Sequence, residues 1–353
     1  MESGAEKSKS FLSIVVETLL KNKAYIYIFL GLFIRVVMLF YYYYIHILDP
    51  SRDWGDLTLN FESTWGGYPL ITQLFLDLFR FLSFGFIEIM AFWGFFWDLI
   101  VCFLLYFVLK SFSIKKIYYA YGLFLLNGFF FLNNSFSIEN CGYHLTDSIF
   151  FVFLFLSLIF CPKKEIYNKF LFYIFLAFSL GAKYYTLPAV GFFFIKFIIE
   201  KDWKEMKIFL ISTIPILLFI IVIPTFLFPQ ISSGLLDWYN TGTGAIIPLF
   251  IRLIPIAIIF IVYTVVRLKS ASKLEIIIIS TIAMASFMIF SYPYVRWFQS
   301  IIFLGILNEK EFFTLHLNFK IIKREIKVDN HLLTFYLSFI GVILAVLFII
   351  FVY

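Results

Sequence analysis

The sequence predicts an all-α protein, a polytopic transmembrane bundle of about 11 helical spans, some of them short. Hydrophobic residues make up 62% of the 353 residues and charged residues only 14%, a composition whose apolar surface a soluble fold cannot hide. The apolar runs are continuous and do not alternate with polar residues, so they favour helices over a closed β-barrel. Lys and Arg gather in the loops on one side of the predicted bundle, which is the pattern of cytoplasmic loops.

The predicted topology starts with a basic amphipathic segment, residues 1–23, so the N-terminus is expected on the cytoplasmic face. We expect one membrane domain over residues 1–353, with residues 49–83 as the first external loop and residues 308–331 as a basic cytoplasmic segment. The predicted spans include two out-and-back pairs of short helices, within 170–200 and within 274–307. The other spans are 24–48, 86–109, 117–132, 145–160, 208–228, 246–266 and 332–353.

The second half of the first external loop predicts a short interfacial helix that lies in the plane of the membrane surface. The hydrophobic side chains recur at helical spacing and would share one face, with only Leu76 interrupting the opposite, polar face. The apolar face comprises Leu70, Ile71, Leu74, Phe75, Leu78, Phe79 and Leu82, and the polar face comprises Thr72, Gln73, Asp77 and Arg80.

The charge balance does not indicate a nucleic-acid-binding protein. The net charge of +6 arises from Lys and Arg in short loops on one side, as the positive-inside rule describes. Cys102, Cys141 and Cys161 are far apart and form no CxxC pair, so a disulfide framework or a zinc site is not expected.

The first external loop opens with an acidic cluster that includes Arg52, Asp53, Asp56 and Glu62. Several carboxylates at a membrane surface could supply a general base or hold a divalent cation, Mg²⁺ or Mn²⁺. A solvated loop that keeps negative charge outside explains the same residues equally well.

Three more ionisable groups are expected on the external side. Asp147 begins a returning span and could cap that helix, but His144 lies three residues before it and could exchange protons in the same external cavity. Lys183, in the turn GAKYYTLP, and Arg296, in YPYVRW, could extend to the interface or bind phosphate.

Two opposite charges are predicted at mid-depth in the first two spans. Arg35 and Asp98 each lie about a dozen residues from their helix ends, where an isolated charge is costly. We expect a mutual ion pair that joins the two spans; a proton relay is the alternative.

The order of these features resembles the GT-C superfamily of multi-spanning glycosyltransferases. The resemblance covers residues 24–307 and depends on the internal arginine in GLFIRVVML, the acidic RDWGD, the Tyr-Pro of GGYPLITQLFLDLF, HLTDSIFFVFLFLSL, LGAKYYTLPAVGFFF and YPYVRWFQSIIF. The chain departs from the family pattern in its short first loop, its Asp-Trp-Gly-Asp in place of Asp-X-Asp, and its lack of a second proline after Tyr-Pro.

The resemblance implies an inverting transferase on the non-cytoplasmic face, in a prokaryotic plasma membrane or the endoplasmic reticulum of a eukaryote. The donor would be a dolichyl- or polyprenyl-phosphate sugar, with mannose as the family's commonest sugar, and the acceptor a glycan, lipid or protein. Asp56, or else Asp53, would act as the base, with a divalent cation as an optional cofactor that these two residues could hold. The expected substrate-binding residues are Arg52, Glu62, Tyr68, His144, Asp147, Lys183 and Arg296.

Two other functions fit the composition. A lipid-linked-sugar flippase or secondary transporter predicts an inverted repeat and broken helices at mid-depth, whereas the sequence has no internal symmetry. A non-catalytic scaffold subunit would explain the spans but not the carboxylates and cations expected on one external face.

Overall fold

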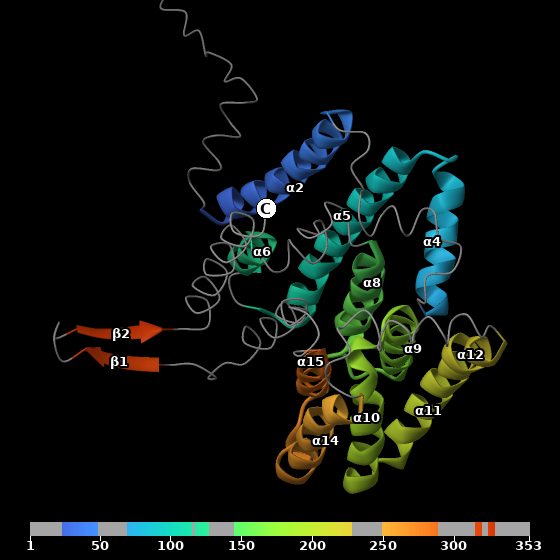
Figure 1. The fold of residues 1–353 in the computed structure, drawn as a ribbon. Coiled ribbons are helices and arrows are strands. Elements are labelled where there is room, and N and C mark those ends of the chain that lie inside the picture. Colours follow the sequence, from blue (N-terminus) through green and yellow to red (C-terminus); the bar gives the residue numbers. More distant parts are fainter. Residues whose placement is uncertain are drawn as a thin grey trace, which may run out of the picture.

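The computed structural model describes residues 23–48, 69–114, 117–126, 145–227, 249–288, 315–319 and 324–328. This part of the chain is helical apart from one short antiparallel hairpin (Figure 1), so the predicted helical class is confirmed. The hairpin pairs β1 (Leu315–Phe319) with β2 (Arg324–Val328) inside the predicted basic segment, where no strand was expected.

The described helices follow the predicted apolar runs, whereas the second helix of the pair predicted within 274–307 and the predicted last span, 332–353, lie outside the described residues. In chain order they are α2 (Lys23–Leu48), α4 (Leu70–Leu82), α5 (Ile87–Ser111), α6 (Ile117–Leu126), α8 (Leu145–Phe160), α9 (Ile166–Ala182), the 3₁₀ turn η1 (Tyr184–Thr186), α10 (Leu187–Glu200), α11 (Trp203–Leu217), η2 (Leu218–Val222), α12 (Ile223–Leu227), α14 (Leu249–Val266), η3 (Leu268–Ser270) and α15 (Lys273–Met288).

The pair of short helices expected within residues 170–200 is confirmed as α9 and α10. Proline in the first turn of α10 suits a helix start, because that position needs no N–H partner. Lys201 ends α10 in the left-handed conformation, with φ 56°, and Asp202 then begins the next helix by accepting a hydrogen bond from Glu205 N at 3.0 Å.

The predicted span 208–228 is one apolar run but not one regular helix. Pro215 lies inside α11, and the chain continues from there into the π-helical turn η2. Proline has no N–H to donate and its ring crowds the preceding turn, so the backbone widens locally.

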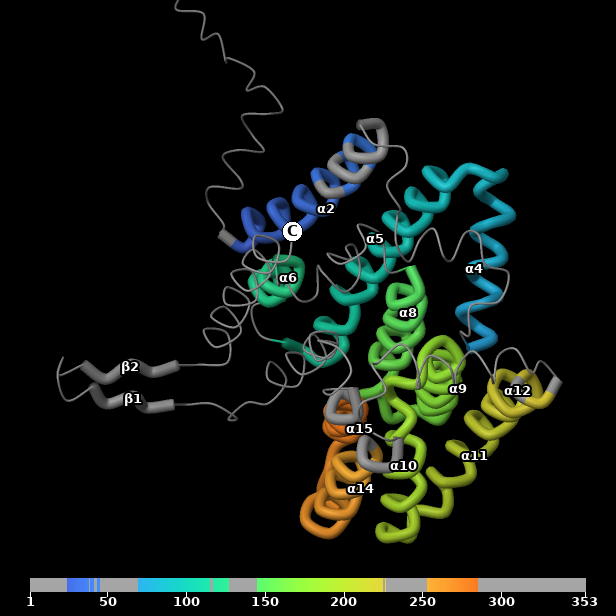
Figure 2. Tube along the Cα trace, in the orientation of Figure 1, coloured from blue at the N-terminus to red at the C-terminus, as the bar shows by residue number. Residues whose placement is uncertain are grey.

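Helix α8 is the centre of the arrangement. It packs against α5 on one side and α9 on the other, and Figure 2 shows α10, α14 and α15 gathered beyond one end of these helices. At the far side of α5, helices α2 and α6 approach closely: a Cβ added to Gly31 would lie 2.5 Å from Leu125 Cβ. Glycine at this position therefore permits the contact of α2 with α6.

A buried ion pair joins α2 to α5, as the sequence predicted. Arg35 Nε lies 3.1 Å from Asp98 Oδ2, and both side chains are fully buried. The same guanidinium donates to the carbonyl oxygens of Gly31 at 2.8 Å and Leu125 at 2.9 Å. One side chain thus connects three helices.

Helix α4 is present where the amphipathic pattern predicted it, but its faces are distributed differently. Thr72 and Gln73, expected on the polar outer face, are buried, whereas Leu74 and Leu78 are 54% and 46% exposed. Burial of the polar pair is possible because Thr72 donates to Ala182 O at 2.7 Å and Gln73 Nε2 to Asp77 Oδ1 at 3.2 Å.

Aromatic contacts hold α4 beside the bundle. Phe79 contacts Trp97 with ring centroids 5.5 Å apart. Phe75 lies 5.2 Å from the Trp97 ring and 5.8 Å from the Phe153 ring of α8. Figure 1 shows α4 running alongside α8.

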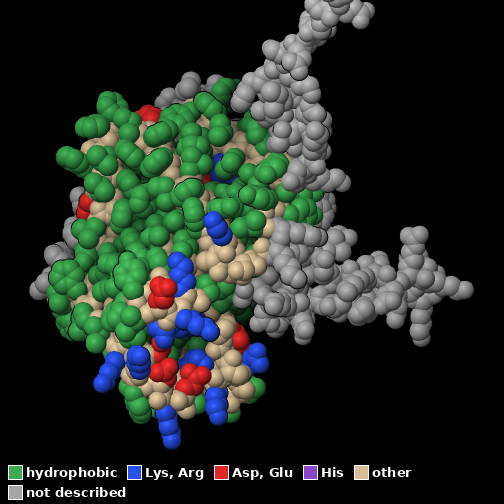
Figure 3. Space-filling model, turned by 180° about the vertical axis from the view of Figure 1, so that it is seen from behind, with side chains coloured by type: hydrophobic (Ala, Val, Ile, Leu, Met, Phe, Trp, Pro, Cys, Tyr) green, Lys and Arg blue, Asp and Glu red, His purple; other side chains and the backbone are tan. Residues whose placement is uncertain are grey.

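Two helical segments in the described part of the chain are long and apolar enough to cross a membrane, Ile87–Ser111 and Trp203–Val222. Five shorter apolar helical segments accompany them. Many large apolar side chains are exposed, including Phe226 at 81% and Val265 at 80%. Figure 3 shows hydrophobic side chains covering most of one face, with most of the charged side chains gathered at one end.

We expect Arg35→Met to lower the free energy of unfolding by about 3–5 kcal/mol, because it leaves the Asp98 carboxylate buried without its cation. Adding Asp98→Leu should recover most of that loss, since no buried charge then remains. Thermal unfolding of the purified protein measures both changes. The exposed pair Arg267–Glu275, 3.0 Å apart, is the control, and Arg267→Gln should cost at most about 1 kcal/mol. Equal losses for the two arginine variants would contradict the assigned role of Arg35.

Candidate functional site

The structure describes two of the residues predicted to form the external site, Asp147 and Lys183. The others, Arg52, Asp53, Asp56, Glu62, Tyr68, His144 and Arg296, lie outside the described residues.

Asp147 and Lys183, 36 positions apart in the chain, form an ion pair. Lys183 Nζ lies 2.5 Å from Asp147 Oδ1 and 3.2 Å from Tyr185 Oη. The Tyr185 hydroxyl donates to the same carboxylate oxygen at 3.3 Å. Asp147 is fully buried in the first turn of α8, where the helix dipole favours a negative charge.

The local sequence explains how Lys183 reaches this position. Helix α9 ends at Ala182, and Lys183 is extended, with φ −152° and ψ 144°. The 3₁₀ turn that follows places the Tyr185 hydroxyl next to the same carboxylate. It also places the Tyr185 ring next to the Lys183 ammonium group, which lies 5.2 Å from the ring centroid. The Lys183 side chain is 12% exposed, so this buried cluster reaches the surface through the lysine.

The start of α4 is attached to the same turn. Thr72 donates to the carbonyl of Ala182, directly before Lys183, and Pro69 at the α4 N-terminus is buried. A Cβ on Gly181 would lie 2.3 Å from Ile220 Cγ2 and 3.0 Å from Ile71 Cγ1, so glycine permits this close approach. The start of α4, which follows the acidic loop in the sequence, therefore lies next to the Asp147–Lys183 pair.

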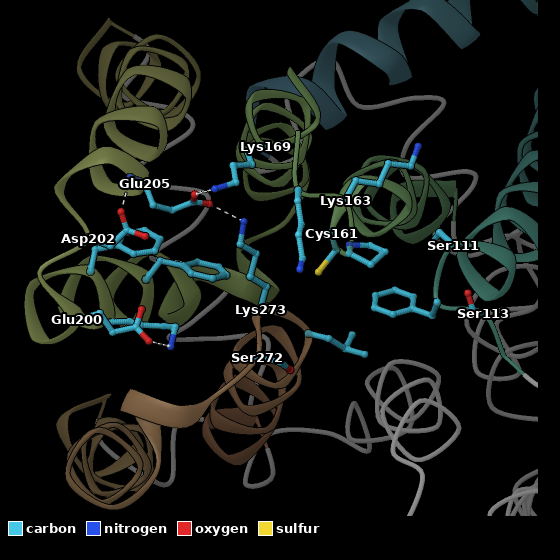
Figure 4. Close-up of a pocket in the computed structure, with 17 residues that line it drawn as sticks. Ser111, Ser113, Cys161, Lys163, Lys169, Glu200, Asp202, Glu205, Ser272 and Lys273 are labelled. Carbon is cyan, nitrogen blue, oxygen red and sulfur yellow. Dashed lines mark hydrogen bonds and ion pairs between the residues drawn. The ribbon is translucent and has the colours of Figure 1, made fainter. Parts of the chain in front are cut away.

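A second polar cluster, centred on Glu205, lies at the other end of the α8–α9 hairpin. The Glu205 carboxylate, 4% exposed, pairs with Lys169 and lies 2.6 Å from Lys273 Nζ. The Tyr173 hydroxyl donates to it at 2.9 Å. Lys273 also lies over the Tyr173 ring, 4.9 Å from its centroid. Figure 4 shows the two ammonium groups pointing toward Glu205 from separate elements.

These groups line an open cavity of about 610 Å³ (Figure 4). It is bounded by the end of α5, the α8–α9 turn, the α10–α11 turn and the start of α15. The charged residues in its lining are Lys163, Lys164, Lys169, Lys196, Lys273, Glu200, Asp202 and Glu205. Five lysines against three carboxylates leave an excess of two positive charges.

The two clusters lie at opposite ends of helices α8 and α9. Asp147 and Cys161 are 14 residues apart along α8, and Lys169 and Lys183 are 14 apart along α9. At 1.5 Å per residue these separations correspond to about 21 Å. The Glu205 cluster thus lies on the side that the sequence assigned to the cytoplasmic loops, away from the predicted external site.

Sequence reasoning missed the Glu205 cluster because each lysine has a sufficient explanation as a cytoplasmic loop residue. The one local signal is a glutamate between lysines in KDWKEMK, at a helix start. Its partners Lys169 and Lys273 lie 36 and 68 positions away, which a local pattern cannot reveal.

The described residues contain no group of three or more His, Cys, Asp or Glu side chains that could hold a metal ion. The carboxylates predicted as optional metal ligands, Asp53 and Asp56, are outside the described ranges. The prediction of a divalent cation therefore stays a prediction.

The Cys161 thiol in the cavity wall should be unreactive. Burial raises its pKa to about 12, although the nearby Lys273 ammonium acts in the opposite direction, so thiolate is scarce at neutral pH. We expect labelling of Cys161 by iodoacetamide at about pH 8 to be at least ~10-fold slower than labelling of an exposed cysteine. Ser113→Cys, an exposed position in the same cavity, is the reference, and peptide mapping measures both. Equal rates in the folded protein would contradict the buried placement.

Stability should depend on the ionisation of Glu205, which precedes the apolar run of α11. Burial is the largest influence and raises its pKa, but hydrogen bonds from Lys169, Lys273 and Tyr173 outweigh it, and the pKa is lowered overall. The folded state therefore favours the ionised carboxylate of Glu205. This carboxylate contributes its full stabilisation when the pH is above its pKa in the unfolded chain, and the contribution is lost as the pH falls through its lower pKa in the folded protein.

We expect Glu205→Gln to lower the free energy of unfolding by about 1.5–3 kcal/mol at neutral pH, the usual value for a hydrogen bond to a charged group. The difference from the wild type should shrink as the pH is lowered below about 4, where the wild-type carboxylate is also neutral. Thermal unfolding between neutral pH and pH values below about 4 measures this difference. The control is Glu200→Gln, the same substitution at a less buried glutamate. A difference that is constant with pH would contradict this assignment.

Comparison of the chain with protein families, with curated proteins and with solved structures gave no match. A functional interpretation therefore has to be built on the residues of this chain and on the contacts that its fold creates.

Proposed function

We propose that this protein is a multi-pass integral membrane glycosyltransferase of the GT-C type. It would transfer a sugar from a polyprenyl-phosphate donor to an acceptor on the non-cytoplasmic face. The observation that supports this best is the meeting of Asp147, Lys183 and the start of α4 at one end of the bundle. Helix α4 follows the acidic loop with Asp53 and Asp56 in the sequence.

The surface of the described helices supports a membrane location. Long apolar helices with exposed Phe, Ile, Leu and Val side chains are costly in water and stable in lipid. Charged side chains concentrated at one end (Figure 3) suit the boundary between hydrocarbon and water. A multi-pass arrangement of about 11 spans is part of this proposal.

The proposed reaction is a single displacement at the anomeric carbon. Asp56, or else Asp53, removes the proton from the acceptor hydroxyl, whose oxygen forms the new bond to carbon. The bond between carbon and the phosphate oxygen breaks, and the polyprenyl phosphate leaves with the electron pair. The configuration at the anomeric carbon inverts because the acceptor attacks from the opposite side.

Lys183 is the residue of the described part that fits the leaving phosphate. Its ammonium group is held by the buried Asp147 carboxylate and its side chain is 12% exposed, so the cation is positioned before substrate binds. A fixed cation directed at the developing negative charge stabilises the transition state more than the ground state. Arg296 is proposed as the second cation, and Asp147 as the residue that positions Lys183.

The direct test measures release of sugar from a polyprenyl-phosphate donor by the purified full-length protein. We expect the double substitution Asp53→Ala and Asp56→Ala to abolish transfer, and Lys183→Gln to slow turnover by about 10²-fold or more. Lys183→Arg should retain part of the activity because it keeps the positive charge. A chelator added to the wild-type assay would establish whether a divalent cation takes part.

Two matched controls separate catalysis from folding. Glu275→Gln removes a carboxylate of the exposed Arg267–Glu275 pair, 3.0 Å apart, and Lys201→Gln removes an exposed lysine in the α10–α11 turn. Both should retain turnover. Full activity of the Asp53/Asp56 double variant would overturn the proposal. Donor movement across vesicles without any sugar transfer would favour a flippase instead.

A further inference from the structure

We propose that the cavity beside Glu205 binds an anion that carries a phosphate group, held by Lys164, Lys169 and Lys273. This site is about 21 Å from the Asp147–Lys183 pair, along the α8–α9 hairpin, and the inference does not depend on the proposed sugar transfer.

The first argument is an imbalance of charge in a confined space. Glu205 is shared by Lys169 and Lys273, so this part of the cluster carries one more positive charge than negative. The whole lining has an excess of two positive charges. Like charges held near one another raise the energy of the site until a counter-ion balances them. A phosphomonoester, with a charge of about −1.5 to −2 at neutral pH, matches this excess.

The second argument is the supply of hydrogen-bond donors. An ammonium group has three N–H bonds. Among the described residues, Lys169 and Lys273 each donate to Glu205 alone. Lys196, in contrast, donates to Glu200 at 2.6 Å and to the carbonyls of Leu268 and Lys269 at 3.4 and 3.1 Å. The N–H bonds of Lys196 are therefore used within the protein, whereas Lys169 and Lys273 each keep N–H bonds that can be donated to a ligand.

The third argument is position and room. The two lysines come from separate helices, α9 and α15, and Glu205 holds both ammonium groups at the cavity wall. Lys164 adds an exposed cation from the α8–α9 turn. A volume of about 610 Å³ is typical of small-molecule sites. Ser113 and Ser272 add hydroxyl groups that can bond phosphate oxygens.

The cavity wall also has an apolar part, formed by Phe112, Phe193, Phe197 and Leu274. The ligand could be a free phosphate compound or the headgroup of an anionic lipid, because the recognising chemistry is the same for both. Lysine clusters at the boundary of an apolar bundle suit either source. The experiment distinguishes the two.

Binding is measured by calorimetry on the full-length protein in detergent, with inorganic phosphate, glycerol 3-phosphate and dioctanoyl phosphatidic acid as separate probes and acetate as the negative control. We expect saturable binding of the phosphate probes and none of acetate. Equal affinity for all three phosphate probes would identify a free phosphate as the ligand. At least ~10-fold tighter binding of the phosphatidic acid would identify a lipid headgroup.

The variants test the named residues. Lys164→Gln should weaken binding by about tenfold or more, the effect of losing one charged hydrogen bond. Glu205→Gln should strengthen it, because the excess of positive charge grows and two lysines lose their carboxylate. Lys207→Gln is the matched control, since Lys207 is exposed on α11 and does not line the cavity.

Unfolding temperatures measured without ligand show whether each variant is folded, and Lys164→Gln removes no ion pair of the described residues. Absence of saturable phosphate binding by the wild type would overturn the inference. Equal affinities of the Lys164→Gln and Lys207→Gln variants would overturn it as well.

Discussion

A guanidinium group cannot be left without partners in an apolar interior, and this constraint organises one half of the molecule. Arg35 satisfies it with the Asp98 carboxylate and with carbonyls of Gly31 and Leu125, so α2, α5 and α6 must keep one relative position. Helix α5 in turn contacts α4 through the aromatic ring of Trp97 and packs against α8. Charge pairing, which is costly to disrupt in such surroundings, thus specifies an arrangement that apolar packing alone would leave less well defined.

The α8–α9 hairpin has apolar flanks and polar ends. One end holds Asp147 with Lys183, and the other holds Glu205 with Lys169 and Lys273. Ionisable groups are tolerated at helix ends, where water, helix dipoles and turns can stabilise them. The hairpin keeps two clusters of different charge apart: among the described residues, Asp147 and Lys183 balance at one end, and positive charge is in excess at the other.

The two ends suit different tasks. At the first, a buried carboxylate holds one lysine beside the start of α4, an arrangement that fits the proposed role of stabilising charge that develops during a reaction. At the second, lysines from separate helices share one carboxylate around an open cavity, which is suited to binding a charge that already exists. Both clusters hold lysine ammonium groups in place with a single carboxylate, and they differ in the number of lysines that share it.

The helical class, the position of α4, the α9–α10 pair and the partnership of Arg35 with Asp98 could all be predicted from the sequence alone. These features depend on composition, on periodicity within a few turns, or on two opposite charges at mid-depth in neighbouring apolar runs. Three features could not be predicted in this way: the pairing of Asp147 with Lys183, the two distant lysine partners of Glu205, and the inward orientation of Thr72 and Gln73 on α4. Such contacts depend on how helices far apart in the chain pack, because side chains at a helix end have several partners within reach until that packing selects one.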